Sequence, residues 1–547
     1  MKRFTRVYIW LPLCIAVSIA LGIFIGNIYY VRSGGGQQSF GSGSDKLNTI
    51  FGYINQAYVD SVNVNDLVEK SIPTLLEGLD PHSSYISAES MMLTGHMIEG
   101  HFSGIGVEFM VQEDTITIVN VIFGGPSEAV GIMTGDKIVT VADTTFAGIG
   151  LTNEKVIKTL RGETGSKVKL GIKRSNSHEI LNFTVTRAEI PVESIDAAYK
   201  VVDGIGYIKV NQFAINTFQD FITAIAKLKG QGCKSFIIDL QQNGGGAMAA
   251  ATAMANEFLK KGQMVVYTEG RAYPRQTEYA NGTGTCQDGQ LVIIIDESSA
   301  SASEVFSGAI QDNDRGLIVG RRSFGKGLVQ QQHVFKDGSA IRLTVARYHT
   351  PSGRCIQKAY QTGNYEGYEL DLLNRYKRGE MDNQDSIRFD NLPLFETIGG
   401  RPVYGNDGIM PDVFIPRDTT GYNSYYIKIV NSGSLREFAF SYAERNREKL
   451  KSFDTWEKAA DYISKQNVVD QLATYAERKG IKRRPYLITD AYALINSQLE
   501  ALIIRYSWGS EGFYPLLMKD DKALKKAVEL IQAQKATPEA IKNKKYK

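Results

Sequence analysis

Four serines lie within six residues in the stretch "ESSASASEVFSGAI", residues 297–310. The apolar run "LVIIIDE" leads into the serines, and the residues after them have apolar side chains at helical spacing. This pattern predicts a strand-to-helix turn, where unpaired N–H groups and the positive end of a helix dipole can stabilise an oxyanion. Alanines flank Ser301 and leave room for a substrate backbone, so we expect Ser301 to be a nucleophile. The alternative is a serine that only caps the helix.

The candidate base is a lysine between two glycines, Lys326 in "GRRSFGKGLVQQQ". A lysine just before an apolar strand is an unusual place for a solvated charge. If the amine is desolvated, its pKa falls and the neutral form can accept the proton of a serine. The alternative is a surface lysine in a turn.

Three consecutive glycines, residues 244–246, follow the apolar run "IIDL" in "IIDLQQNGGGAM". Glycines allow a ligand to approach the backbone closely and present bare N–H groups, as an oxyanion hole requires. The alternative is a tight turn between a strand and a helix.

The elements that must position these residues lie in residues 188–418. The runs "GIGYIKV", "KSFIIDL" and "LVIIIDE" are rich in β-branched residues, as in strands buried on both faces, and "FQDFITAIAKLKG" between the first two has helical spacing. We expect a multidomain α/β (α+β) chain whose core is a βαβ, mostly parallel sheet. "LVQQQHVF" and "AIRLTVARYHT" predict a hairpin across "KDGS".

Residues 95–187 read as short strands with glycine turns and one amphipathic helix, "TNEKVIKTLRG". Their order, with "GIG" followed by "GGPSEAVGIMTGDKI", resembles a PDZ domain. The resemblance implies that the backbone of Gly104, Ile105 and Gly106 captures the carboxylate of a chain end beside an added strand.

The N-terminus predicts export. Lys2, Arg3 and Arg6 precede residues 7–31, which carry no charge and are long enough to cross a hydrocarbon core of about 30 Å. We expect a single-pass signal-anchor over residues 1–32 in the inner membrane, with the body on the periplasmic side. The alternative is a signal peptide cleaved at residues 18–20, which also places the body outside the cytoplasm.

The remaining segments are a flexible linker (residues 33–44), an N-terminal helical region (45–94) and a C-terminal helical extension (419–547). The extension predicts either a homodimer interface or a dock for an adaptor protein. The formal net charge of +3 without a long basic face indicates no nucleic-acid partner. The four cysteines have no CxxC spacing, which argues against a zinc site or a disulfide framework.

"SASASE" followed by "GRRSFGKGLVQ" resembles the C-terminal processing peptidases (tail-specific proteases), PDZ-containing serine peptidases with a Ser-Lys dyad. The resemblance implies that Ser301 is the nucleophile, Lys326 the general base and Gln330 the residue that orients the lysine. It also implies that the amides of Gly245 and Ala302 form the oxyanion hole.

Further family-like segments are "LDPHSSYIS", "GIGYIKVNQF", "RYHTPSGRCIQ" and "GIMPD". One departure is "DLQQNGGG", where the family has "DLRGNPGG": Gln241 and Gly244 replace an arginine and a proline, which affects the rigidity of that turn.

The expected function is a serine endopeptidase that cleaves exported proteins near their C-termini through an acyl-enzyme, with no metal or cofactor. The alternative is a catalytically inactive PDZ scaffold that binds protein C-termini. A Ser-His-Asp hydrolase would need a G-x-S-x-G elbow, which the serine turn does not offer. A crotonase-like enzyme would leave the PDZ segment and the serine-lysine pair unexplained.

Overall fold

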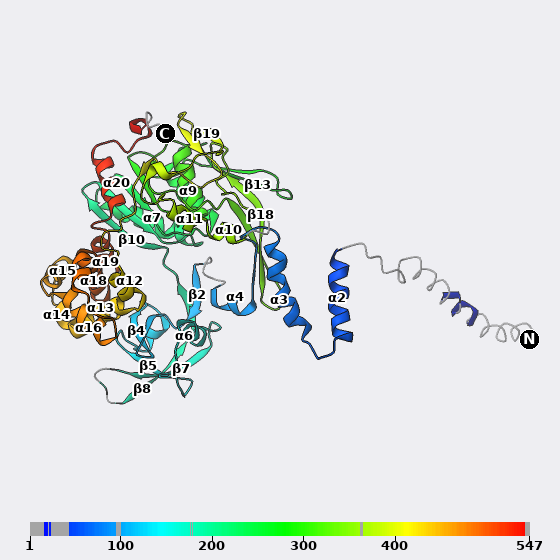
Figure 1. Cartoon of the computed structure of the whole chain (residues 1–547), viewed down its shortest axis with the longest axis horizontal. Coiled ribbons are helices and arrows are strands. Elements are labelled where there is room, and N and C mark those ends of the chain that lie inside the picture. The colour runs from blue at the N-terminus through cyan, green and yellow to red at the C-terminus, as the bar shows by residue number, and fades with distance from the viewer. Residues whose placement is uncertain are drawn as a thin grey trace, which may run out of the picture. The chain divides into compact units, whose positions relative to one another are not determined.

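The computed structural model describes residues 16–19, 21–22, 43–94, 100–174, 177, 179–361 and 365–541. Nearly all of the predicted membrane segment, residues 7–31, and the predicted linker lie outside the described residues. Within those described ranges, no helix combines the length and the apolar character that a membrane span requires. The chain divides into two compact units, Met1–Leu75 and Leu76–Lys547, whose elements are traced in Figure 1.

In the first unit, the described residues from 43 onward include two helices. Helix α2 (Gly43–Ala57) contains Leu47, Ile50 and Ile54 at spacings of three and four residues. Helix α3 (Val64–Glu77) follows and runs across the division between the two units.

The PDZ segment has a six-stranded antiparallel sheet in the order β3-β4-β5-β7-β8, with β6 paired to β5. Strand β2 pairs separately with β9. Branched residues such as Ile116, Ile138 and Ile172 fill the core of the PDZ segment. The elements are β2 (His101–Gly104), β3 (Val107–Gln112), β4 (Thr115–Val121), α5 (Pro126–Ala129), β5 (Lys137–Val141), β6 (Thr144–Thr145), α6 (Asn153–Leu160), β7 (Lys167–Lys173), β8 (Ile180–Thr186) and β9 (Ala188–Pro191).

The core sheet has six strands in the order β10-β11-β12-β15-β16-β21. Every pairing from β11 to β21 is parallel, and only β10 pairs antiparallel with β11. The prediction of a mostly parallel βαβ core is therefore confirmed. The strands are β10 (Ile195–Val202), β11 (Ile205–Val210), β12 (Ser235–Asp239), β15 (Leu291–Ile295), β16 (Leu317–Gly320) and β21 (Val413–Phe414).

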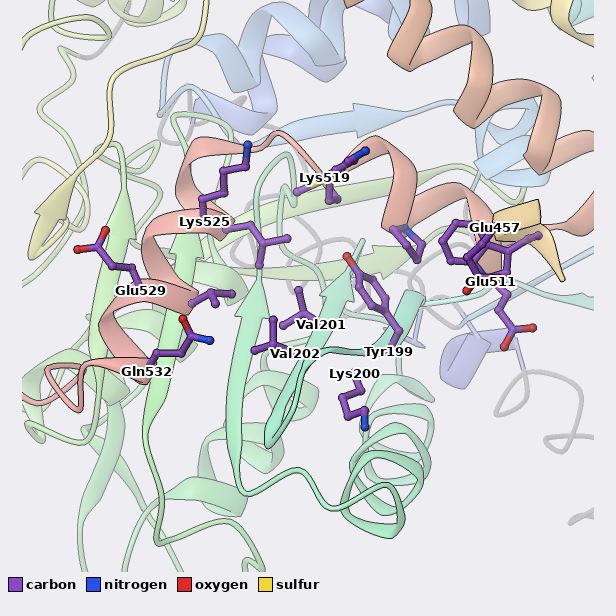
Figure 2. Close-up of a pocket in the computed structure, with 15 residues that line it drawn as sticks. Tyr199, Lys200, Val201, Val202, Glu457, Glu511, Lys519, Lys525, Glu529 and Gln532 are labelled. Carbon is purple, nitrogen blue, oxygen red and sulfur yellow. The ribbon is translucent and has the colours of Figure 1, made fainter. Parts of the chain in front are cut away.

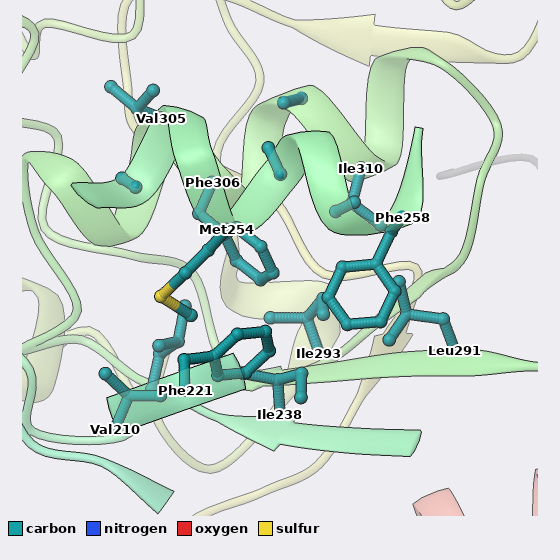
Figure 3. Packing of buried hydrophobic residues seen from close by; sticks show 14 of the residues in the cluster. Val210, Phe221, Ile238, Met254, Phe258, Leu291, Ile293, Val305, Phe306 and Ile310 are labelled. Atoms are coloured by element: carbon teal, nitrogen blue, oxygen red, sulfur yellow. The ribbon is translucent and has the colours of Figure 1, made fainter. Parts of the chain in front are cut away.

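Helices cover both faces of this sheet, as buried parallel strands require. Figure 3 shows one face, where Phe221, Phe258 and Phe306 pack over Ile238 and Ile293. These aromatic residues come from α7 (Thr217–Gly230), α8 (Met248–Phe258) and α9 (Ala302–Asp312).

The opposite face of the sheet is covered by α20 (Lys522–Gln532), near the end of the described chain. Its Leu524, Leu530 and Ile531 are buried in one cluster with Tyr207 and Val292 of the sheet. The last helix of the C-terminal region therefore completes the hydrophobic core of the peptidase segment.

A second, antiparallel sheet has the order β1-β18-β13-β14, with β17 paired to β18. The predicted hairpin across "KDGS" is confirmed by the pairing of β17 with β18. The strands are β1 (Ser84–Ile86), β13 (Met264–Glu269), β14 (Gln276–Tyr279), β17 (Leu328–Val334) and β18 (Ala340–His349).

The chain is helical after residue 419, with a core of its own that contains Phe438, Leu472 and Leu499. Its elements are α12 (Ser424–Asn431), α13 (Ser434–Arg445), α14 (Arg447–Lys451), α15 (Trp456–Ser464), α16 (Val468–Arg478), α17 (Pro485–Asp490), α18 (Tyr492–Trp508), α19 (Ser510–Leu517), α20 and η2 (Pro538–Ile541). The remaining elements are α4 (Ala88–Thr94), α10 (Tyr365–Glu369), α11 (Asp371–Lys377), η1 (Gln384–Ser386), β19 (Leu394–Glu396) and β20 (Pro402–Tyr404).

Candidate active site

The serine turn connects the buried strand β15 to helix α9. Ser301 lies at the N-terminal cap of the helix with φ 56° and ψ −114°, a backbone conformation that non-glycine residues rarely adopt. The turn is held from beneath by Asp296, which accepts the N–H groups of Ser298 and Ser299. The sequence predicts this strand-to-helix turn, and the strained backbone of Ser301 is an addition that the structure makes.

The five residues predicted for the catalytic centre line a single cavity of about 540 Å³. They are Ser301, Lys326, Gln330, Gly245 and Ala302. They meet because β12 and β15 are parallel neighbours, so the glycine turn after one and the serine turn after the other lie at the same edge of the sheet. Lys326 and Gln330 come to the cavity from the start of the β17–β18 hairpin.

Lys326 is partly buried, and among the described residues its ammonium group has no hydrogen bond and no ion pair. Burial lowers the pKa of the Lys326 amine, and the charge of Arg342 lowers it further. Glu304 and Asp80 act in the opposite direction. An amine with a lowered pKa is better able to accept a proton near neutral pH.

Glu304, in the first turn of α9, connects the serine turn to the lysine loop. Its fully buried carboxylate accepts the backbone N–H groups of Ser301, Gly325 and Lys326, each at 2.8 Å, and the hydroxyl of Ser323. Burial raises the pKa of Glu304, and these four donors oppose the rise. Glu304 thus positions the backbone of both candidate catalytic residues.

Tyr348, on β18, also lies against the cavity. Its hydroxyl donates to the backbone carbonyl of Lys326. Burial raises the pKa of Tyr348 well above its usual range, against a hydrogen bond with Ser301 that lowers it. Tyr348 therefore contacts both the serine turn and the lysine loop, as Glu304 does.

Gln330 is in the cavity, but its side-chain amide donates to the backbone carbonyl of His82. His82 lies in the turn "LDPHSSYIS", where Asp80 accepts the N–H groups of His82 and Ser83. The His82 ring bonds the Tyr368 hydroxyl at 2.7 Å. Burial, and then the charge of Lys326, lowers the pKa of His82 to about 4, so the imidazole is neutral at physiological pH.

The predicted oxyanion donors differ in their availability. The Gly245 N–H donates to the side chain of Asn243 at 2.8 Å and is already engaged. The Ala302 N–H, at the start of α9, has no hydrogen-bond partner among the described residues. Gly245 still borders the nucleophile, because a Cβ added there would lie 2.8 Å from the Cβ of Ser301.

Sequence reasoning missed Glu304, Tyr348, Asp80 and His82. A signal for Glu304 was available, because Ser301 and Glu304 have the S-x-x-E spacing of a capping box. The other three belong to segments that resemble the family, but nothing in the sequence gives them a role.

The predicted tail-binding residues lie in a separate groove of about 350 Å³ in the PDZ segment. Gly104, Ile105 and Gly106 line it together with side chains of α6 such as Ile157 and Leu160. Among the described residues, the N–H groups of Ile105 and Gly106 have no hydrogen-bond partner. A groove with bare N–H groups at one end and an apolar wall matches a chain end with its carboxylate.

Another cavity, of about 620 Å³, lies beside β10 and is lined by residues from α19 and α20 (Figure 2). Tyr199, Val201 and Val202 come from the strand, and Met518 and Val528 from the helical side. No candidate catalytic residue lines this cavity.

The parallel core and the antiparallel PDZ segment are the fold of a PDZ-containing peptidase. The sequence matches the model of peptidase family S41 over residues 204–366 and that of the PDZ domain over residues 103–186. Residues 425–509, from α12 to α18, match a family of unknown function, DUF8443.

Two relatives each match more than half of the chain. The carboxy-terminal-processing protease of Bartonella bacilliformis is 33% identical over 351 residues, which are 61% of this chain and 80% of that protein. The carboxy-terminal processing protease CtpA of Bacillus subtilis is 31% identical over 371 residues, 65% of this chain and 76% of that protein. The chain belongs to the carboxy-terminal processing proteases of peptidase family S41.

Among solved structures, the photosystem II D1 C-terminal processing protease is 26% identical, with 57% of this chain and 89% of that chain covered and a TM-score of 0.32. The PDZ domain of the carboxy-terminal protease from Vibrio cholerae, solved with a peptide, is 25% identical, covering 16% of this chain and 97% of that domain with a TM-score of 0.16.

Proposed function

We propose that this protease cleaves exported proteins near their C-termini with Ser301 as nucleophile and Lys326 as general base. The observation that carries the proposal is that both side chains line one cavity, in which the lysine is desolvated and has no carboxylate partner among the described residues. A structural lysine would be paired or exposed.

In the proposed reaction the neutral Lys326 amine takes the proton of Ser301, whose oxygen attacks the peptide carbonyl. The unengaged Ala302 N–H supports a role in stabilising the oxyanion that forms. The new N-terminal amine of the cleaved peptide leaves with the proton from Lys326. Water, with the same lysine as base, then hydrolyses the ester bond and releases the acyl group from Ser301. Gly245 would shape this site through its close approach to Ser301, since its own N–H is bonded to Asn243.

We propose for Gln330 a positioning role that depends on His82. Because the Nε2 atom of Gln330 donates to the His82 carbonyl, its Oε1 atom is left as the end of the amide that can accept from Lys326. The turn held by Asp80 would then determine which way the glutamine faces.

The substrate is proposed to be a protein tail held by the PDZ groove at Gly104, Ile105 and Gly106. The placement of the enzyme outside the cytoplasm, on the periplasmic side of an inner-membrane anchor or free after signal cleavage, rests on the charge pattern of residues 1–32. We also propose that the C-terminal helices form a homodimer interface or bind an adaptor protein.

The test compares exported proteins from cells with the wild-type enzyme and with Ser301→Ala, by mass spectrometry of C-terminal peptides. Tails that shorten only with the wild-type enzyme support the proposal. If Ser301→Ala trims the same tails at the same rate, Ser301 is not the nucleophile and the proposal fails.

A further inference from the structure

Arg342, on β18, places a guanidinium group at the wall of the catalytic cavity. Its Nη2 atom donates to the side-chain oxygen of Gln332 at 2.9 Å, and among the described residues Arg342 forms no ion pair. Other arginines of the same segment that are more deeply buried are paired with carboxylates: Arg322 and Arg375 with Glu380, Arg354 with Asp312, and Arg401 with Asp314 and Asp412.

The basic side chains that line the cavity are Lys326 and Arg342, and no aspartate or glutamate of the described residues lines it. A partly buried cation without a counter-charge carries a desolvation cost, which an anionic ligand removes. A guanidinium group is suited to a carboxylate in particular, because its parallel N–H groups match the two carboxylate oxygens.

We propose that Arg342 binds a carboxylate of the substrate chain beside the scissile bond, so that the cavity selects substrates with an acidic group at that position. The inference rests on the proposed function of Ser301 and Lys326. The carboxylate is that of an Asp or Glu side chain, because the C-terminus of the substrate is proposed to lie in the separate PDZ groove.

A carboxylate bound to Arg342 also changes the pKa of Lys326. Arg342 lowers the pKa of Lys326, whereas Glu304 and Asp80 raise it, and the neighbouring His82 is neutral at physiological pH. A carboxylate bound to Arg342 offsets the field of the guanidinium at Lys326. The acid limb of kcat, which reports groups in the enzyme–substrate complex, therefore moves to higher pH with an acidic substrate than with its neutral analogue.

The test uses synthetic peptides with free C-termini. Cut sites of the wild-type enzyme are first mapped by mass spectrometry on a random-sequence peptide library. A pair of peptides is then made that differ only in Glu or Gln at the position the map favours. We expect the wild-type enzyme to prefer the Glu peptide in kcat/KM by on the order of tenfold, and Arg342→Gln to remove the preference. Arg342→Lys retains part of it, because the charge remains.

The matched control is Arg347→Gln, an exposed arginine on the same strand, which should keep the preference. A second test moves the Glu along the peptide. Cuts that follow the Glu support recognition of its side chain by Arg342, whereas cuts that ignore its position contradict it.

A guanidinium that serves only to lower the pKa of Lys326 gives a different result. Arg342→Gln would then slow the Glu and Gln peptides by the same factor, and the preference ratio would not change. That result overturns the inference and leaves the proposed function intact. Loss of the proposed function would instead appear as unchanged cleavage by Ser301→Ala.

Discussion

The Glu304 carboxylate accepts the backbone N–H of Lys326 at 2.8 Å. The same oxygen, Oε2, accepts the N–H of Ser301 at 2.8 Å, so one buried side chain fixes the backbone of both candidate catalytic residues. The serine turn and the lysine loop are separated along the chain, and this carboxylate is the contact that holds them in register. The relationship makes Glu304 a positioning residue whose role can be tested.

Replacing Glu304 with Gln should damage both stability and catalysis. One oxygen becomes an NH2 group that faces two hydrogen donors, and a buried hydrogen bond to a charged group is worth about 1.5–3 kcal/mol. We expect the free energy of unfolding to fall by about 3 kcal/mol, and kcat to fall by about a hundredfold as the two segments shift. Urea denaturation and peptide cleavage measure the two effects.

The matched control for that change is Glu278→Gln, at an exposed position on β14. It should alter neither quantity. A Glu304→Gln enzyme with wild-type stability and wild-type kcat would show that the shared carboxylate positions nothing.

Activity should rise with pH through the titration of Lys326. Burial and Arg342 lower the pKa of this lysine from its ordinary value of 10.5, so the neutral amine appears below the pH at which an exposed lysine loses its proton. In Ser301-dependent cleavage we expect an acid limb of kcat/KM with its midpoint below 10.5.

The lowered pKa of Lys326 also makes the free energy of unfolding depend on pH. Between the folded pKa of Lys326 and 10.5 the unfolded chain binds one proton more than the folded chain, so stability increases with pH in that window. Lys326→Met should abolish cleavage at every pH and remove this increase. Cleavage by Lys326→Met near the wild-type rate would exclude the lysine as the base.

Gly245→Ala should inactivate the enzyme without a change at any titratable group. Gly245 has φ +99°, and an added Cβ would lie 2.6 Å from the carbonyl oxygen of Ala300 and 2.8 Å from the Cβ of Ser301. The nucleophile must move, and a displacement of about 1 Å can cost on the order of a hundredfold in rate. The measurement is kcat/KM on a peptide, beside a thermal melt.

The control variant Gly262→Ala distinguishes steric crowding of Ser301 from the backbone strain of an alanine at positive φ. Gly262 has a similar φ of +84°, but an added Cβ meets no atom within 4 Å. It should lower stability and leave the activity of the folded enzyme in place. Equal activity losses for the two variants would mean that backbone strain, and not crowding of Ser301, explains Gly245→Ala.

Much of the fold and the meeting of the candidate residues follow from local sequence. The β-branched runs, the helical spacing between them and the turn in "KDGS" are short-range signals, and they place the core strands and the hairpin correctly. Because parallel strands bring their carboxyl ends to one edge, the glycine turn and the serine turn come together without any long-range knowledge. Lys326 is brought to them by the hairpin.

What could not be predicted depends on pairings between distant segments. Gln330 bonds the carbonyl of His82, 248 positions earlier in the chain, and no local pattern indicates that contact. The engagement of the Gly245 N–H by Asn243 is local, but it depends on the conformation of the turn after β12. The packing of α20 on the core sheet likewise depends on a return of the chain that its amphipathic pattern does not specify.

The PDZ groove offers a prediction about tail binding that is independent of catalysis. Ile157 of α6 lines the same groove as Ile105 and Gly106, so we expect it to contact the last apolar side chain of a bound tail. Ile157→Ser should weaken binding on the order of tenfold, since burial of such a side chain is worth about 1.5–3 kcal/mol. Fluorescence anisotropy with the Ser301→Ala enzyme and a labelled peptide measures the affinity without turnover.

Glu154→Ser, an exposed position on the same helix, is the control and should leave the affinity unchanged. Amidation of the C-terminus of the peptide should weaken binding to the wild-type groove, because the bare N–H groups of Ile105 and Gly106 then lose a charged acceptor. If Ile157→Ser and amidation both leave the affinity unchanged, the tail is held elsewhere and the groove is not the recognition site.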